Sequence, residues 1–167
     1  SGVNSWITND ANNYNTGENS WVLSPEFDFT GQGDPVIAMS IWWQAEFSWD
    51  GASLQVSTDG GNTWATVGAT NDPNNWYTDN TIGGLGFTGS QEGWSGRGTG
   101  ANSGSNGWVT ASHSLDGVGG NDSVYFRVAF GSDGSVTDDG FAFDDVSIVI
   151  PAPAQSMVME MGTSDTV

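Results

Sequence analysis

Residues 36–47 read VIAMSIWWQAEF, and this stretch decides the fold. Alternation of apolar side chains with a period of two is typical of a strand that buries one face. The other face changes from apolar to polar towards Glu46, so we expect the strand to leave the core there and to place Glu46 in a rim loop. The predicted first row of the core consists of Ile37, Met39, Ile41 and Trp43.

Other alternating runs, each bounded by turn residues, predict an all-β chain with antiparallel strands in two packed sheets. The 25 glycines, mixed with Asn, Ser, Thr and Asp, indicate many turns, and no uninterrupted stretch has helical spacing. Apolar residues change parity between Phe143 and Val146, which predicts a bulge or burial on both sides. The remaining expected strands span residues 20–29, 52–58, 63–68, 107–115, 123–130 and 140–150, with short strands around Trp76 and Trp94.

The charge balance excludes whole classes of partner. The 167 residues include 2 Lys+Arg and 20 Asp+Glu, which gives a net charge of −18. Nucleic acids and anionic membrane surfaces require a basic surface, so neither is an expected partner. With one His and no Cys, zinc sites of the usual kind and thiol nucleophiles are also excluded. Carboxylates, amides and backbone carbonyls remain, and these oxygens suit Ca²⁺.

We expect one domain over residues 1–150, followed by a Pro/Ala linker and tail over residues 151–167, where the linker reads Pro151-Ala152-Pro153-Ala154. The absence of Cys and the strong acidity favour a secreted or cell-surface protein. We therefore expect a module of a larger secreted protein, with neighbouring domains and an export signal upstream.

Catalytic motifs are weak. Residues 57–64 read STDGGNTW and match the Asp-box hairpin of sialidase propellers, a folding motif, but a sialidase needs repeated copies and several arginines. His113 lies near serines, yet no nucleophile elbow is present. A glycosidase pair drawn from Glu46, Glu92 and Glu18 stays open, although no spacing selects one. We expect no catalytic residue in this module.

Binding of a cation explains the clusters of Asp and Glu residues better than catalysis does. Adjacent Asp144 and Asp145 in an aromatic strand would be costly to bury, and a calcium ion would remove that cost. The alternative is that the strand pleat exposes one of them while the other accepts backbone amides. The candidate calcium ligands are Glu46, Asp50, Asp144, Asp145, Asp133 and Glu18.

An ordered series of motifs resembles a known family. The motifs are NSWVLSPEFDF at 19–29, Trp42-Trp43 with Glu46 and Asp50-Gly51-Ala52, the Asp-box at 57–64, FRVAFGSD at 126–133 and GFAFDDVSI at 140–148. This series resembles the MAM-like jelly-roll modules of secreted immune-inhibitor-A metallopeptidases and the related cleaved-adhesin ("choice-of-anchor J") domains of bacterial surface proteins. The resemblance implies an antiparallel jelly roll, structural calcium held by Glu46, Asp50 and Asp144, and an accessory role without chemistry of its own. The opening strand of such modules is not evident before Trp6.

Two functions remain open. In the first, the module binds a polysaccharide or cell-surface glycan through exposed loop aromatics, for which the candidates are Trp49, Trp76, Tyr77 and Trp94. In the second, it is a protein-adhesion or spacer domain. Aliphatic residues are few, so most of the nine tryptophans must be buried, and we assign Trp21, Trp43 and Trp64 to packing. A neutral glycan tolerates a partner with a charge of −18, which favours the first function.

Overall fold

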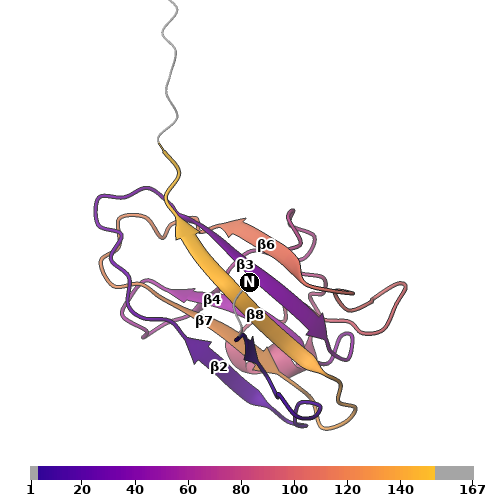
Figure 1. Ribbon diagram of the computed structural model, residues 1–167. Coiled ribbons are helices and arrows are strands. Elements are labelled where there is room, and N and C mark those ends of the chain that lie inside the picture. The colour runs from indigo at the N-terminus through magenta and orange to yellow at the C-terminus, as the bar shows by residue number, and fades with distance from the viewer. Residues whose placement is uncertain (1–3, 153–167) are drawn as a thin grey trace, which may run out of the picture.

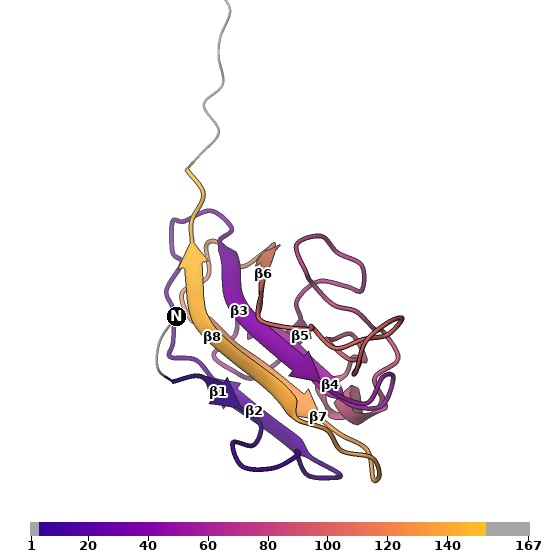
Figure 2. The ribbon, with the colours of Figure 1, turned by 45° about the vertical axis from the view of Figure 1, so that its right-hand side comes forward.

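Most of the alternating stretch at residues 36–47 forms an inner strand, β3 (Val36–Gln44), in which every second residue is buried. The computed structural model describes residues 4–152, and these form a β-sandwich of two antiparallel four-stranded sheets (Figures 1 and 2). One sheet has the order β1-β8-β3-β6 and the other has the order β2-β7-β4-β5. The all-β prediction and the predicted core row of β3 are therefore confirmed.

Six of the seven remaining strands agree with the expected runs, although several are shorter, whereas β1 was not predicted. Their bounds are β1 (Trp6–Ile7), β2 (Asn19–Leu23), β4 (Gly51–Ser57), β5 (Ala65–Thr66), β6 (Val109–Ser114), β7 (Tyr125–Gly131) and β8 (Gly140–Val149). The long loop contains one short 3-10 helix, η1 (Gly83–Thr88), and isolated bridges instead of the expected short strands. The linker and tail predicted from residue 151 lie outside the described residues from position 153 onward.

A bulge in β8 explains the change of parity at the paired aspartates. The pairing of β8 with β3 shifts between Ala38 and Ser40, so one extra residue of β8 is accommodated there. Asp145 has a φ of 51°, a left-handed conformation that Asp adopts more readily than most residues. Asp144 is half-buried and Asp145 is exposed. The bulge therefore accounts for the change of parity without an ion.

Aromatic rings fill the core, as the shortage of aliphatic residues requires. Trp94 is fully buried, lies edge-to-face with Trp76 and Tyr77, and stacks on Phe141 at 5.6 Å between centroids. The Trp94 indole N–H donates to the carbonyl of Asn75 at 3.0 Å, so its one polar atom is satisfied. These contacts attach the long loop to the sandwich.

Two of the three tryptophans assigned to packing need correction. Trp43 is buried as expected, but Trp21 is 53% exposed on the outer face of its sheet. Trp64 is half-buried and contacts Arg127 instead of the inter-sheet core. The assignment of Trp21 to packing is wrong because alternation along β2 places Asn19, Trp21 and Leu23 on the exposed side.

The Asp-box hairpin forms as predicted between β4 and β5. Asp59 accepts hydrogen bonds from the Thr63 backbone N–H at 2.9 Å, the Thr63 hydroxyl at 2.6 Å and the Ser57 hydroxyl at 2.7 Å. These bonds, led by the one from the Thr63 hydroxyl, lower the pKa of Asp59 to about 2. The carboxylate therefore stabilises the turn.

We expect Trp94→Ala to lower the free energy of unfolding by about 3–5 kcal/mol, because it empties a buried aromatic site. Trp108, which is 52% exposed, provides the control, and Trp108→Ala should change stability by less than about 0.5 kcal/mol. Urea unfolding measures both. Equal effects of the two substitutions would contradict the packing role of Trp94.

The Asp59 turn predicts a pH dependence. The pKa of the Asp59 carboxyl is lower in the folded chain than the value of about 4 in unfolded chains. The stability that the ionised carboxylate gives the folded chain is therefore complete above about pH 4 and is lost as the pH falls towards 2. Asp59→Asn should be less stable than the native chain at about pH 6, and the difference should shrink on acidification through this window. Urea titrations across the range test this, and a difference that does not vary with pH would disprove it.

Candidate functional site

Three carboxylates meet at one rim of the sandwich. Glu46 follows β3, Asp50 directly precedes β4 and Asp133 follows β7, and one oxygen from each lies within 4.8 Å of the others. The register of β4 with β7 pairs Gly51 with Gly131, which brings the residues beyond these glycines together. This carboxylate cluster therefore follows from the antiparallel register, the β3–β4 turn and the start of the β7–β8 loop.

Asp50 is the most deeply placed member of the carboxylate cluster. The residue is fully buried, and its two carboxylate oxygens accept hydrogen bonds from the Tyr14 hydroxyl and from the backbone N–H of Asp133, both at 2.7 Å. Burial raises the pKa of the Asp50 carboxyl above its ordinary value, and these two hydrogen bonds oppose the shift. Because each oxygen accepts only one of these bonds, lone pairs remain for a further ligand.

Tyr14 holds this carboxylate in place. Its hydroxyl donates to Asp50 and accepts from the backbone N–H of Glu46 at 3.2 Å, while its ring packs edge-to-face on Phe130 at 4.9 Å. Burial, followed by the bond to Asp50, raises the pKa of Tyr14 above its ordinary value. The hydroxyl therefore stays protonated and remains a donor at neutral pH.

Only one cation of the described chain lies beside the carboxylate cluster. The Arg97 guanidinium is 4.0 Å from Glu46 and 3.9 Å from Asp138, so two carboxylates share it at a half-exposed position. Three clustered carboxylates with a shared, screened arginine leave uncompensated negative charge. Their oxygens are the hard ligands that Ca²⁺ prefers, and water can supply the remaining coordination positions. The residues present thus fit a hard divalent cation.

The structure brings together half of the predicted metal ligands, namely Glu46, Asp50 and Asp133. The backbone N–H of Glu18 donates to the Ser132 hydroxyl, close to the carboxylate cluster. The Glu18 carboxylate, however, accepts hydrogen bonds from Asn15 and Ser20. Sequence reasoning missed Tyr14 and Arg97. Tyr14 lies in an Asn-rich segment without any regular pattern, so the sequence carries no signal for its role.

The prediction that Asp144 and Asp145 join the carboxylate cluster is wrong. Strand β8 runs antiparallel to β3, so Gly140 pairs with Gln44 beside the rim, whereas Asp144 pairs with Ser40. Ser40 precedes Glu46 by six residues, which is about 20 Å of extended chain. Strand direction therefore separates the paired aspartates from the rim.

Three of the four aromatic residues that were predicted to bind a ligand are buried. Trp76 and Tyr77 are each 2% exposed and Trp94 is fully buried, so none can offer a ring face to a glycan. The long loop folds back onto the sandwich and uses these rings as core. Trp49 is 53% exposed, next to the carboxylate cluster, and is the one member of the set available on the surface.

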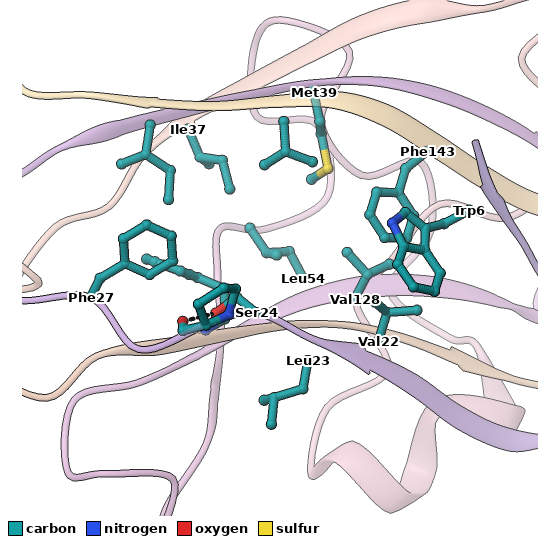
Figure 3. A pocket seen from close by; sticks show the side chains of 14 residues that line it. Trp6, Val22, Leu23, Ser24, Phe27, Ile37, Met39, Leu54, Val128 and Phe143 are labelled. Atoms are coloured by element: carbon teal, nitrogen blue, oxygen red, sulfur yellow. Dashed lines mark hydrogen bonds between the residues drawn. The ribbon is translucent and has the colours of Figure 1, made fainter. Parts of the chain in front are cut away.

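An apolar cleft of about 400 Å³ opens between the two sheets, and Figure 3 shows side chains of both sheets facing one another across it. Trp6 stacks with Phe143 at one end. Among the described lining residues, polar side-chain atoms come from the Ser24 hydroxyl, which already donates to the carbonyl of Pro25, and from the Trp6 indole N–H. A ligand site needs polar groups that orient its occupant, so the carboxylate cluster is the stronger candidate.

No protein-family model matches the chain, and no curated protein does either. Within residues 4–152, no helix is long and apolar enough to cross a membrane.

The Tyr14–Asp50 bond predicts a measurable loss. Tyr14→Phe leaves a buried carboxylate oxygen of Asp50 without its donor, which should cost about 1–3 kcal/mol of unfolding free energy. Tyr125→Phe is the matched control, because the Tyr125 hydroxyl lies beside the exposed carboxylate of Glu26 instead of a buried one. Chemical unfolding of both variants tests this, and a Tyr14→Phe variant as stable as the control would contradict the buried bond.

Proposed function

We infer that the chain is a non-catalytic, calcium-stabilised accessory module of a secreted bacterial protein, and that it binds carbohydrate. The observation that carries the calcium assignment is the rim cluster of Glu46, Asp50 and Asp133, which lie within 4.8 Å of one another with one shared arginine. A bound cation would offset the repulsion among these carboxylates. The resemblance to MAM-like and cleaved-adhesin modules also implies structural calcium, with Asp144 where the rim cluster has Asp133. Its jelly-roll connectivity stays a prediction.

In this proposal the ion has a structural role. It would join the β3–β4 turn, which carries Glu46 and Asp50, to the β7–β8 loop, which carries Asp133. When bound, Ca²⁺ supplies positive charge and oxygen coordination and no reaction chemistry. Asp50 and Tyr14 keep the site ordered through the buried hydrogen bond between them.

Carbohydrate is the ligand class that fits the charge of the chain. At −18, the protein repels polyanions, whereas neutral glycans are unaffected by its field. A second candidate function is that of a protein-adhesion or spacer domain. The burial of Trp76, Tyr77 and Trp94 favours it, because Trp49 is then the one exposed residue among the loop aromatics proposed for glycan contact.

Calcium should raise the thermal stability of chelator-treated protein. Ca²⁺ at about 100 times its dissociation constant should add about 2.7 kcal/mol to the free energy of unfolding. Magnesium should substitute poorly, because it requires near-ideal octahedral geometry and retains its waters. Asp133→Asn should weaken the calcium effect, while Asp144→Asn should preserve it, since Asp144 lies away from the carboxylate cluster.

Thermal melts in EDTA, millimolar Ca²⁺ and millimolar Mg²⁺ test these statements. Melts in EDTA and Ca²⁺ that overlay would remove the calcium proposal. Loss of the calcium effect in Asp144→Asn but not in Asp133→Asn would place the ion elsewhere.

A further inference from the structure

The outer face of the sheet β2-β7-β4-β5 carries exposed rings around a guanidinium. We call Trp21, Trp64, Phe87 and Arg127 the aromatic platform. The guanidinium carbon of Arg127 lies 5.3 Å from the Trp21 ring centroid and 4.2 Å from the Trp64 ring centroid. Phe87, from η1, lies 6.4 Å from Trp21 between centroids. Four separate segments of the chain thus converge on one surface.

The sheet register explains this convergence. Arg127 pairs with Leu23 of β2 on one side and with Gln55 of β4 on the other. Alternation directs Trp21, two residues from Leu23, to the same outer face. The Asp-box turn places Trp64 just before β5, beside the same row.

A buried amide holds the aromatic platform in shape. Gln55 is fully buried, its side-chain oxygen accepts from Arg127 Nε at 2.7 Å, and its side-chain nitrogen donates to the carbonyl of Thr88 at 3.0 Å. Gln55 therefore connects the arginine to η1, the segment that carries Phe87. Preorganisation of this kind lowers the entropy lost when a ligand binds.

The aromatic platform is open to solvent. Trp21 is 53% exposed and Phe87 is 37% exposed. Within residues 4–152, neither terminal nitrogen of Arg127 has a hydrogen-bond acceptor, since its one hydrogen bond is made through Nε. The surface therefore combines apolar ring area with free, fixed donors.

This combination matches the chemistry of a neutral sugar. A pyranose ring has an apolar C–H face that packs on aromatic rings and equatorial hydroxyls that accept from a guanidinium. An acidic polysaccharide is disfavoured, because one arginine faces a chain with a net charge of −18. A neutral, extended glycan makes both the ring contact and the hydrogen bond to the guanidinium, and the negative charge of the protein does not repel it.

We propose that the aromatic platform binds a chain of neutral pyranose residues, with Trp21 and Phe87 as ring contacts and Arg127 as hydroxyl donor. This assignment rests on the carbohydrate binding proposed above. It moves the contact surface from the loop aromatics to the outer face of the sheet. Gln55 and Arg127 lie four residues from Gly51 and Gly131, about 13 Å along their strands from the rim, so the site needs no calcium ion in contact with the sugar.

The test uses three tryptophans of matched exposure. Trp21, Trp49 and Trp108 are 53%, 53% and 52% exposed, so each can be replaced by Ala without emptying the core. Affinity electrophoresis and pull-down with cellulose, chitin, xylan and mannan as neutral probes, and polygalacturonate as the acidic probe, measure binding of the full chain. At least one neutral probe should bind, and Trp21→Ala should weaken it at least tenfold while Trp49→Ala and Trp108→Ala leave it unchanged.

Arg127→Lys keeps the charge but removes the planar group and the bond to Gln55, and should also weaken binding while circular dichroism shows an intact fold. Binding should persist in EDTA at temperatures where the chain stays folded.

Each contrary outcome has a distinct meaning. If the native chain binds none of the five probes, both the carbohydrate function and the aromatic platform are overturned, and the calcium proposal is unaffected. If a neutral probe binds and Trp49→Ala abolishes binding while Trp21→Ala does not, the function stands and the platform is overturned. Unchanged binding in all three variants also overturns the platform. Binding to polygalacturonate alone overturns the assignment of a neutral ligand.

Discussion

The buried carboxylate of Asp50 is the interaction on which the rim depends. Burial of a charged group is costly unless hydrogen bonds compensate it, and here the Tyr14 hydroxyl and the Asp133 backbone N–H supply them. Three segments that are distant in sequence are thereby fixed at one point: the N-terminal segment, the β3–β4 turn and the β7–β8 loop. A glycine contact supports the arrangement, because a Cβ at Gly131 would clash with the carbonyl oxygen of Gly84 in η1.

The shortage of aliphatic residues accounts for much of the remaining architecture. Trp94 exchanges backbone hydrogen bonds with Ala52, and the Tyr77 hydroxyl bonds to both backbone groups of Leu54, so loop aromatics extend the edge of β4. The same rings fill the space between the sheets. This is how a chain with long Gly- and Asn-rich loops forms an ordered sandwich, and it leaves few aromatic side chains on the surface. Of the exposed aromatic residues within 4–152, Trp21 and Phe87 lie on the outer face of the second sheet, whereas Trp6, Trp49 and Trp108 lie elsewhere.

Local pattern allowed prediction of the sandwich and of part of the site. The alternation through β3 and the Asp-box turn are encoded by neighbouring residues, and both form as expected. Asp50 and Asp133 were identifiable as acidic residues at strand ends. Their partner Tyr14 was not, because the contact spans 36 positions and the surrounding sequence has no period.

The misplaced residues share a non-local cause. Asp144 lies away from the rim because of the direction of β8, and Trp76 and Trp94 are buried because the long loop folds back over β4. Neither strand direction nor the path of a loop is written in local composition. The exposed position of Trp21, by contrast, follows from the alternation of β2, which places it on the same side as the polar Asn19.

The most direct test of the calcium account is a crystal structure of the chain grown in calcium, with anomalous diffraction recorded at long wavelength. We expect one anomalous peak bounded by oxygens of Glu46, Asp50 and Asp133 at about 2.3–2.6 Å, with Tyr14 still bonded to Asp50. A map with no peak among these three residues, or with its peak at Asp144 and Asp145, would contradict it.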